Sequence, residues 1–243
     1  MQLDSINLRL RPRVMWESCD LGVRLLQSWL RSVFTSYLAV ALPLFALFIA
    51  TYGIAGWLPG LLIWMSKPWL DRTILFALSR ALFGTATTPI DVWEAQRGVW
   101  WSQLLQTLTL RRLTGSRSFT QPILQLERLT GADRRKRVQQ LVVRHRGVAR
   151  TMTQAFTAAE FALLVSLMSL EVWLTPHAVA MNLPSMLAGF AHGQGLELTI
   201  AYAAAVAFVE PFYVAAGFGM YLNRRVELEA WDIEQEFRRA FAA

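Results

Sequence analysis

The sequence predicts an all-α fold, a polytopic membrane helical bundle of about four transmembrane helices with interfacial and cytoplasmic amphipathic helices. Of its 243 residues, 54% are hydrophobic and 17% are charged, which is too apolar for an ordinary soluble domain. The 24 Lys and Arg residues all avoid two windows, 32–66 and 151–223, that hold most of the hydrophobic residues. Because basic loops are retained in the cytoplasm, this segregation predicts that both termini are cytoplasmic.

The chain reads as a single membrane domain, 1–243, with five consecutive parts. These are a cytoplasmic arm (1–32), a first helical hairpin (33–75), an interfacial and basic cytoplasmic region (76–153), a second helical hairpin (154–223) and a cytoplasmic C-terminal helix (224–243). The end of the arm predicts an interfacial helix, because four apolar residues recur at helical spacing: Leu21, Leu25, Leu26 and Trp29.

The first hairpin contains no charged residue from Val33 to Met65, a run too long for one span of about 20 residues and short for two. Four turn-favouring residues interrupt it: Gly53, Gly56, Pro59 and Gly60. We expect one span over 33–52 and a return span that starts near Trp57 and continues past Lys67. The favoured interpretation of Lys67 is that it snorkels to the cytoplasmic interface, and the alternative is a buried ion pair.

Two amphipathic helices are predicted after the first hairpin. Residues 74–83 repeat apolar side chains beside Arg72 and Arg80, which suits a helix in the inner headgroup region. Thr88, Pro89 and Asp91 then form a helix start, with Thr88 as the N-cap. We assign the following helix, 89–113, to the cytoplasmic surface, and its entry into the bilayer stays open.

The cytoplasmic loop from Arg111 to Arg150 holds eleven basic and two acidic residues. We expect six basic residues to contact lipid or a partner. They lie in a capped helix of this loop and at the point where the last span re-enters the cytoplasm: Arg134, Arg135, Lys136, Arg137, Arg224 and Arg225. In a membrane protein of net charge +7, anionic phospholipid is a nearer polyanion than nucleic acid, which we judge an unfavoured partner.

The second hairpin predicts spans over 156–174 and 198–222. Glu210 lies at the midpoint of the last span, where a carboxyl group costs about 2.5 to 3.5 kcal/mol and needs a partner, a proton or a hydrated cavity. Pro211 follows it and frees a backbone carbonyl one turn earlier. The favoured interpretation is packing, in which Glu210 pairs across the bundle with Lys67 or Arg80. The alternative is transport. Gly217 and Gly219 predict close helix packing.

Other polar residues give weaker signals. Glu160 and Glu171 share a face of the third span, as in a proton or cation path, but hydration near the interfaces is favoured. His177 and His192 lack the tight spacing of metal ligands, so no metal site is predicted. No hydrolase motif, P-loop or dinucleotide fingerprint is present, so we predict neither an enzyme nor a cofactor.

Three stretches resemble a family of uncharacterised proteobacterial inner-membrane proteins: WMSKPWLDRTILFALSRALFG from Trp64, RSFTQPILQLERLTG from Arg117, and EPFYVAAGFGMYLNRRVELEAWDIEQEFRR from Glu210. The last is also loosely similar to the membrane domain of some glycerophosphodiester phosphodiesterases, through Pro211, Tyr221, Arg224, Arg225 and Asp232. The resemblance implies a multi-pass protein of the bacterial inner membrane and names no substrate.

The sequence therefore favours a non-catalytic inner-membrane protein, a scaffold or subunit of a membrane complex. It would dock a cytoplasmic protein partner, a second copy of the chain or anionic lipid through its basic loop. The alternative is a transporter or lipid-handling subunit in which Glu210 and Pro211 belong to a mobile, kinked helix. A hydrated cavity that reaches Glu210 would favour the alternative, and a tightly packed bundle would favour the scaffold.

Overall fold

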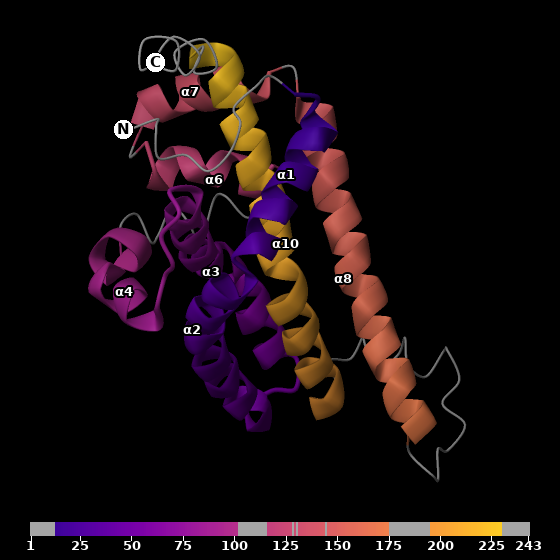
Figure 1. Ribbon diagram of the computed structural model, residues 1–243. Helices are drawn as coiled ribbons and strands as arrows, with labels where there is room; N and C mark the ends of the chain where they lie inside the picture. Colours follow the sequence, from indigo (N-terminus) through magenta and orange to yellow (C-terminus); the bar gives the residue numbers. More distant parts are fainter. Residues whose placement is uncertain are drawn as a thin grey trace.

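The protein is predominantly helical in the part of the chain that the computed structural model describes, residues 13–101, 116–127, 129, 131–143, 145–174 and 195–229. The all-α prediction is confirmed for these residues (Figure 1). The helices are α1 (Met15–Ser28), α2 (Leu30–Ala50), α3 (Leu58–Leu82), α4 (Pro89–Glu94), α6 (Arg117–Gln125), α7 (Gly131–Val142), α8 (Arg146–Leu174) and α10 (Leu196–Glu229), with the short turns η2 (Thr51–Gly53) and η3 (Arg97–Trp101).

Helix α10 is the axis of the bundle. Its 34 residues make it about 51 Å long at 1.5 Å per residue. Five helices pack against it: α1, α2, α3, α6 and α8. Of these, α8 packs mainly on α10 and stands away from the other helices (Figure 1). Side chains on several helices can therefore meet at α10.

Within the described residues, three helices are long and apolar enough to cross a membrane: 30–53, 146–170 and 196–229. The predicted return span, α3, has 25 residues and is long enough, but it carries four charged side chains. These are Lys67, Asp71, Arg72 and Arg80. Three of them, Lys67, Asp71 and Arg72, are buried inside the bundle rather than exposed on its surface.

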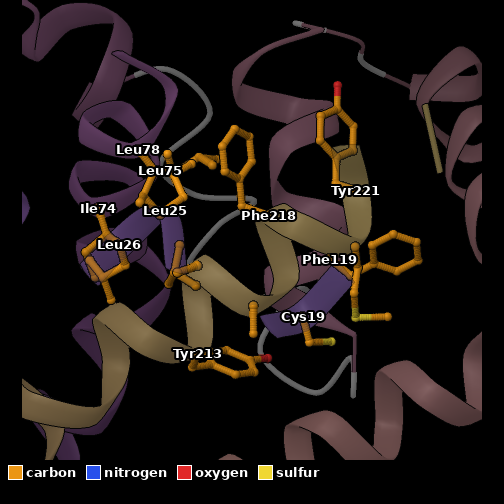
Figure 2. Packing of buried hydrophobic residues seen from close by; sticks show 14 of the residues in the cluster. Cys19, Leu25, Leu26, Ile74, Leu75, Leu78, Phe119, Tyr213, Phe218 and Tyr221 are labelled. Carbon is orange, nitrogen blue, oxygen red and sulfur yellow. The ribbon is translucent and has the colours of Figure 1, made fainter. Parts of the chain in front are cut away.

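The predicted interfacial helix over 74–83 is wrong, because these residues complete α3. Proline at position 68 does not end the helix, which runs unbroken from Leu58 to Leu82. Ile74 and Leu78 are fully buried and pack with Leu25 and Leu26 of α1 in the main core (Figure 2). The apolar stripe of this segment therefore faces protein, which a helical periodicity cannot distinguish from lipid.

Helix α1 has the predicted amphipathic pattern, but its apolar face packs on α10 instead of lying free at an interface. Gly22 of α1 faces Gly219 of α10, and a Cβ atom on either glycine would overlap backbone atoms of the other helix. Gly217 lies equally close to Ser118 of α6. The predicted small-residue face of α10 is thus confirmed as a site of close approach.

The predicted helix start at Thr88 is confirmed. Thr88 and Asp91 form a reciprocal capping box, and Pro89 occupies the first turn. The α-helix ends at Glu94 and a π-helical turn follows, in which the Trp100 indole donates a hydrogen bond to Thr73 of α3 at 3.1 Å. Residues 102–113 of the predicted helix lie outside the described residues.

Part of the basic region 111–150, which was predicted as a cytoplasmic loop, forms helix α6 and packs into the bundle. Phe119 and Ile123 are fully buried, and the helix packs on α10 and α3. Gln121 and Gln125 donate side-chain hydrogen bonds to the backbone carbonyls of Pro68 and Arg72. These bonds fix α6 against α3.

The second hairpin extends beyond its predicted limits. Helix α8 begins at Arg146, ten residues before the expected start at 156, and α10 continues through the expected boundary at 223–224 to Glu229. The C-terminal segment up to Glu229 is therefore part of α10 rather than a separate helix. The outer loop with His177 and His192, and residues 230–243 with Asp232, lie outside the described residues.

Candidate functional site

Five charged side chains from four helices meet in the interior of the bundle. Lys67 and Asp71 come from α3, Arg117 from α6, Glu160 from α8 and Glu210 from α10. Lys67 and Asp71 are four residues apart, so they share one face of α3. The docking of α6 on α3 places Arg117, its first residue, beside them.

Glu210 is the centre of this cluster. Its Oε2 lies 2.9 Å from Lys67 Nζ, and its Oε1 accepts a hydrogen bond from Arg117. Only 2% of Glu210 is exposed. The expectation that Glu210 pairs with Lys67 or Arg80 agrees with the structure for Lys67, whereas Arg80 pairs with Asp91.

Lys67 and Glu160 differ from the favoured interpretations. Lys67 does not snorkel to an interface, because its ammonium group is held between Glu210 and Glu160, with the Glu160 oxygen at 2.6 Å. Glu160 therefore has a buried cation as its partner instead of interfacial water. Both corrections arise because α8 and α10 approach the same face of α3. The side chain of Glu171 lies outside the described residues.

Asp71 is fully buried and its carboxylate is incompletely satisfied. Arg117 Nε lies 2.9 Å from Asp71 Oδ2, but the two atoms are not aligned for a hydrogen bond, and neither Asp71 oxygen accepts one from a described residue. Asp71 and Glu210 share Arg117 as a partner, because the Glu210 carboxylate lies at the Nη2 atom of the same guanidinium. Arg117 also stacks over the ring of Tyr213, at 5.3 Å from its centroid.

A pocket of about 390 Å³ opens beside the cluster, between α3, α8 and α10. Its charged side is formed by Lys67, Arg117, Glu160 and Glu210. Its remaining walls are mainly aromatic and aliphatic, with Trp64, Phe156, Phe161, Leu164, Tyr202, Val209 and Tyr213 among them. This combination suits a molecule with one polar and one apolar part.

Pro211 lies next to Glu210 and does not interrupt α10, which is helical on both sides of it. Proline has no backbone N–H, so the Ala207 carbonyl loses its usual helical donor. The weakened turn lies at the height of the pocket. It is the place where α10 bends at least cost.

A second ion-pair network lies at the end of α10. Arg137 of α7 pairs with Glu127 and Glu229, and Arg225 pairs with Glu229 at 2.6 Å. The Tyr221 hydroxyl donates to Glu127 at 2.8 Å. Burial alone lowers the pKa of Arg137, but its bonds to the two glutamates raise it above the usual value for arginine. This network fastens α7 to α10.

The predicted lipid-contact residues divide into two groups. Arg137, Arg224 and Arg225 form intramolecular ion pairs, and Arg134 is partly buried, which lowers the pKa of its guanidinium. Arg135 and Lys136 are exposed. Arg137 and Arg225 are thus engaged in holding helices together, a role that a count of basic residues does not reveal.

Asp71 and Arg117 were not among the residues singled out from the sequence. The signal for Asp71 was its spacing of four residues from Lys67, which places a carboxylate and an ammonium on one face of α3. The signal for Arg117 was the apolar spacing of Phe119 and Ile123 in an otherwise basic region. Among the described residues, no group of His, Cys, Asp and Glu could hold a metal ion.

Comparisons with protein-family models, curated proteins and solved structures found no match to this chain.

Proposed function

We propose that this chain is an integral protein of the bacterial inner membrane, with four spans and cytoplasmic termini, that binds and moves a small amphiphilic molecule. The pocket carries the proposal, because its charged side reaches Glu210 and its other walls are apolar. The polar part of the molecule would contact the charged cluster. The apolar part would lie between α8 and α10.

The fourth span in this proposal is α3. Charged side chains within a membrane face the protein interior and pair with one another, and Lys67 and Asp71 do both. Arg72 is also buried and donates a hydrogen bond to the Trp100 carbonyl at 3.2 Å. The charges that lower the apolarity of α3 are therefore compatible with a spanning helix.

Helix α8 is the element that can open the pocket. Only 11% of its candidate span is buried, and its packing is mainly against α10. The ion pair of Lys67 and Glu160 links it to α3 across the pocket. Breaking one ion pair would therefore allow α8 to move, while the bend at Pro211 accommodates the change.

Binding at this pocket can be tested with decyltrimethylammonium, decylphosphocholine and decyl sulfate, which share a chain and differ in head-group charge. Native mass spectrometry should show that at least one of them binds the purified protein. Thr157→Trp, which fills the pocket, should weaken that binding about tenfold or more. Ala158→Trp, on an exposed position of α8 outside the pocket lining, should leave it unchanged. Equal binding to both variants, or no binding to the wild type, would refute the proposal.

Transport is tested by uptake of the bound probe into proteoliposomes. Glu210→Gln removes the central charge and should abolish uptake while circular dichroism shows a folded helical protein. If Glu210→Gln instead transports normally and only unfolds at a lower temperature, Glu210 serves packing alone.

A docking function is the second candidate. The specific observation is that Arg135 and Lys136 remain exposed, and that Lys136 borders a shallow surface pocket with Arg224 and Leu228 at the end of α10. A basic, partly apolar surface of this kind suits anionic phospholipid at the membrane surface. The bound headgroup would contact Arg135 and Lys136.

This candidate is tested with the double variant Arg135→Gln/Lys136→Gln, which leaves the Arg137 ion pairs intact. The fold of this variant should be unchanged. In surface plasmon resonance, the purified variant should bind phosphatidylglycerol nanodiscs more weakly than the wild-type protein does. A matched control is Ala132→Gln, a neutral change at an exposed position of the same helix outside the pocket lining. Unchanged binding by the double variant would remove this candidate.

A further inference from the structure

The charged cluster contains one more acid than base. Asp71, Glu160 and Glu210 supply three carboxyl groups, and Lys67 and Arg117 supply two cations. Asp71 is 0% exposed and Glu210 is 2% exposed, so water screens the excess negative charge poorly. A buried site of this kind needs one further positive charge.

The positions of Asp71 and Glu210 indicate where that charge lies. Both carboxyl groups lie against one guanidinium, with Asp71 Oδ2 2.9 Å from Arg117 Nε and Glu210 Oε1 at Arg117 Nη2. Two carboxylates held against the same guanidinium repel each other, which favours one proton shared between them. A proton on Asp71 also gives this carboxyl group a hydrogen bond to Glu210, which it otherwise lacks from described donors.

Among the described residues, the cations that form ion pairs with the two acids are Lys67 and Arg117. Lys67 already lies between Glu160 and Glu210, and Arg117 between Asp71 and Glu210. The other titratable groups near the pair are phenols: Tyr37 from α2, and Tyr202 and Tyr213 from α10. The Tyr37 hydroxyl is buried and makes no hydrogen bond with a described residue.

The pocket lies on one side of the pair. Glu160 and Glu210 line it, whereas Asp71 does not and lies behind Glu210. Five aromatic side chains also line the pocket: Trp64, Phe156, Phe161, Tyr202 and Tyr213. Aromatic faces attract cations, and a cation beside Glu210 would supply the same missing charge as the proton. An anion would enlarge the imbalance.

We propose that Asp71 and Glu210 share one proton while the pocket is empty, and that a lipophilic cation entering the pocket replaces it. The O–H bond on the pair breaks, the proton leaves to water, and the electron pair remains on the carboxylate. The cation then balances the charge from the pocket side. This inference rests on the proposed function, since it names the class of molecule that the pocket takes.

The shared proton has a spectroscopic test that needs no ligand. Infrared spectroscopy of the wild-type protein at neutral pH should show the C=O stretch of a protonated carboxyl group shielded from deuterium exchange. Asp71→Asn should remove this band, and Asp91→Asn, which changes an acid outside the cluster, should retain it. Asparagine is isosteric with a protonated aspartic acid, so Asp71→Asn should also melt close to the wild-type temperature. Absence of the band from the wild type, or a large fall in Tm in Asp71→Asn, would overturn the shared proton.

Exchange of the proton for a cation is tested by measuring the Kd of decyltrimethylammonium against pH. If one proton leaves for each cation bound, the affinity should rise about tenfold per pH unit over the range in which the pair is protonated. Asp71→Asn should bind more weakly and lose this dependence. Glu160→Gln, which removes the excess acid of the cluster, should also bind the cation more weakly.

The outcomes separate this inference from the function on which it rests. If decylphosphocholine or decyl sulfate binds and is blocked by Thr157→Trp, but decyltrimethylammonium does not bind, the pocket function stands and the cation inference fails. If the cation binds with no pH dependence, the exchange fails. If none of the three probes binds, the proposed function itself fails, and the infrared result alone decides whether the pair holds a proton.

Discussion

Lys67 shows how one side chain holds three helices together. Its ammonium group, on α3, lies between the carboxylates of Glu160 on α8 and Glu210 on α10. Burial of these charges is unfavourable, so each is tolerated only while its partners are present. The loss of one partner should therefore cost more than the loss of a matched pair.

Lys67→Met tests this arrangement. Leaving two acids without their shared cation should lower the free energy of unfolding by about 3 to 5 kcal/mol, as for other broken buried pairs. The double variant Lys67→Met/Glu160→Gln removes one cation and one anion and should recover part of the loss. Unfolding in mixed micelles with increasing SDS measures both. A double variant less stable than the single one would contradict the pairing.

Cys19 is the single cysteine of the chain, and it is buried in the core between α1 and α10 (Figure 2). Burial, with a smaller effect of the neighbouring Asp20 carboxylate, raises the pKa of its thiol to about 12. The thiol therefore stays protonated and poorly nucleophilic at neutral pH.

Iodoacetamide at pH 8 should consequently label the native protein far more slowly than the SDS-unfolded protein, as measured by intact mass. The raised pKa also predicts a loss of stability at high pH. The unfolded thiol ionises near pH 9 and the folded thiol does not, so this contribution is complete below about pH 9 and falls between pH 9 and about 12. Equal labelling rates in the two states would contradict the burial of Cys19.

At the scale of elements, α1 and α10 touch through their backbones. A Cβ atom on Gly219 would lie 2.1 Å from the Ser18 carbonyl oxygen, and one on Gly22 would lie 2.0 Å from the Ala215 carbonyl oxygen. Backbone atoms on a packed helix cannot move aside as a flexible side chain can. The two helices must separate if either glycine gains a methyl group.

Gly219→Ala should therefore destabilise the protein by about 1 to 3 kcal/mol, the usual cost of overpacking. Gly60→Ala is the matched control, because Gly60 lies in α3 with no atom within 4 Å of the added Cβ. Alanine favours helix more than glycine, so the control should be neutral or slightly stabilising. Thermal unfolding in one detergent compares the two. Equal Tm values would mean that α1 does not pack as described.

At the scale of the whole molecule, the topology depends on α3. If α3 crosses the membrane, the turn after α2 and helix α7 lie on opposite sides of it. If it does not cross, they lie on the same side. Ile54 in the turn and Arg135 in α7 are both exposed and report on the two positions.

Cysteine labelling in intact cells measures this topology. In a Cys19→Ser background, Ile54→Cys should react with a membrane-impermeant maleimide from outside, and Arg135→Cys should react only after the membrane is permeabilised. Labelling of both from the same side would refute the four-span proposal. Labelling of Arg135→Cys alone from outside would reverse the orientation.

Some helices could be predicted from the sequence and others could not, for a physical reason. Apolar runs and caps are local signals, so α2, the start of α4 at Thr88 and the small-residue face of α10 could be predicted. The roles of 74–82 and of α6 could not. Their apolar stripes are equally compatible with a lipid surface and with a protein neighbour, and only the neighbour itself decides between them.

The candidate site was predicted in part. A carboxyl group in the middle of an apolar run needs a partner wherever it lies, and this made Glu210 conspicuous. Its partners come from positions 67 and 117, which are 143 and 93 residues away in the chain. No local pattern connects residues at such separations.

The sequence by itself determined the helical class, the apolar segments and the presence of an acid that required compensation, because these follow from the composition and period of short segments. Only the tertiary structure decided that Lys67 and Arg117 compensate it, that Asp71 lies beside it, and that a pocket opens there. The physical reason is that burial and ion pairing depend on which helix faces are brought together. The packing on α10 decides which helix faces meet, because its glycines set the distance to α1 and the docking of α6 places Arg117 beside Glu210.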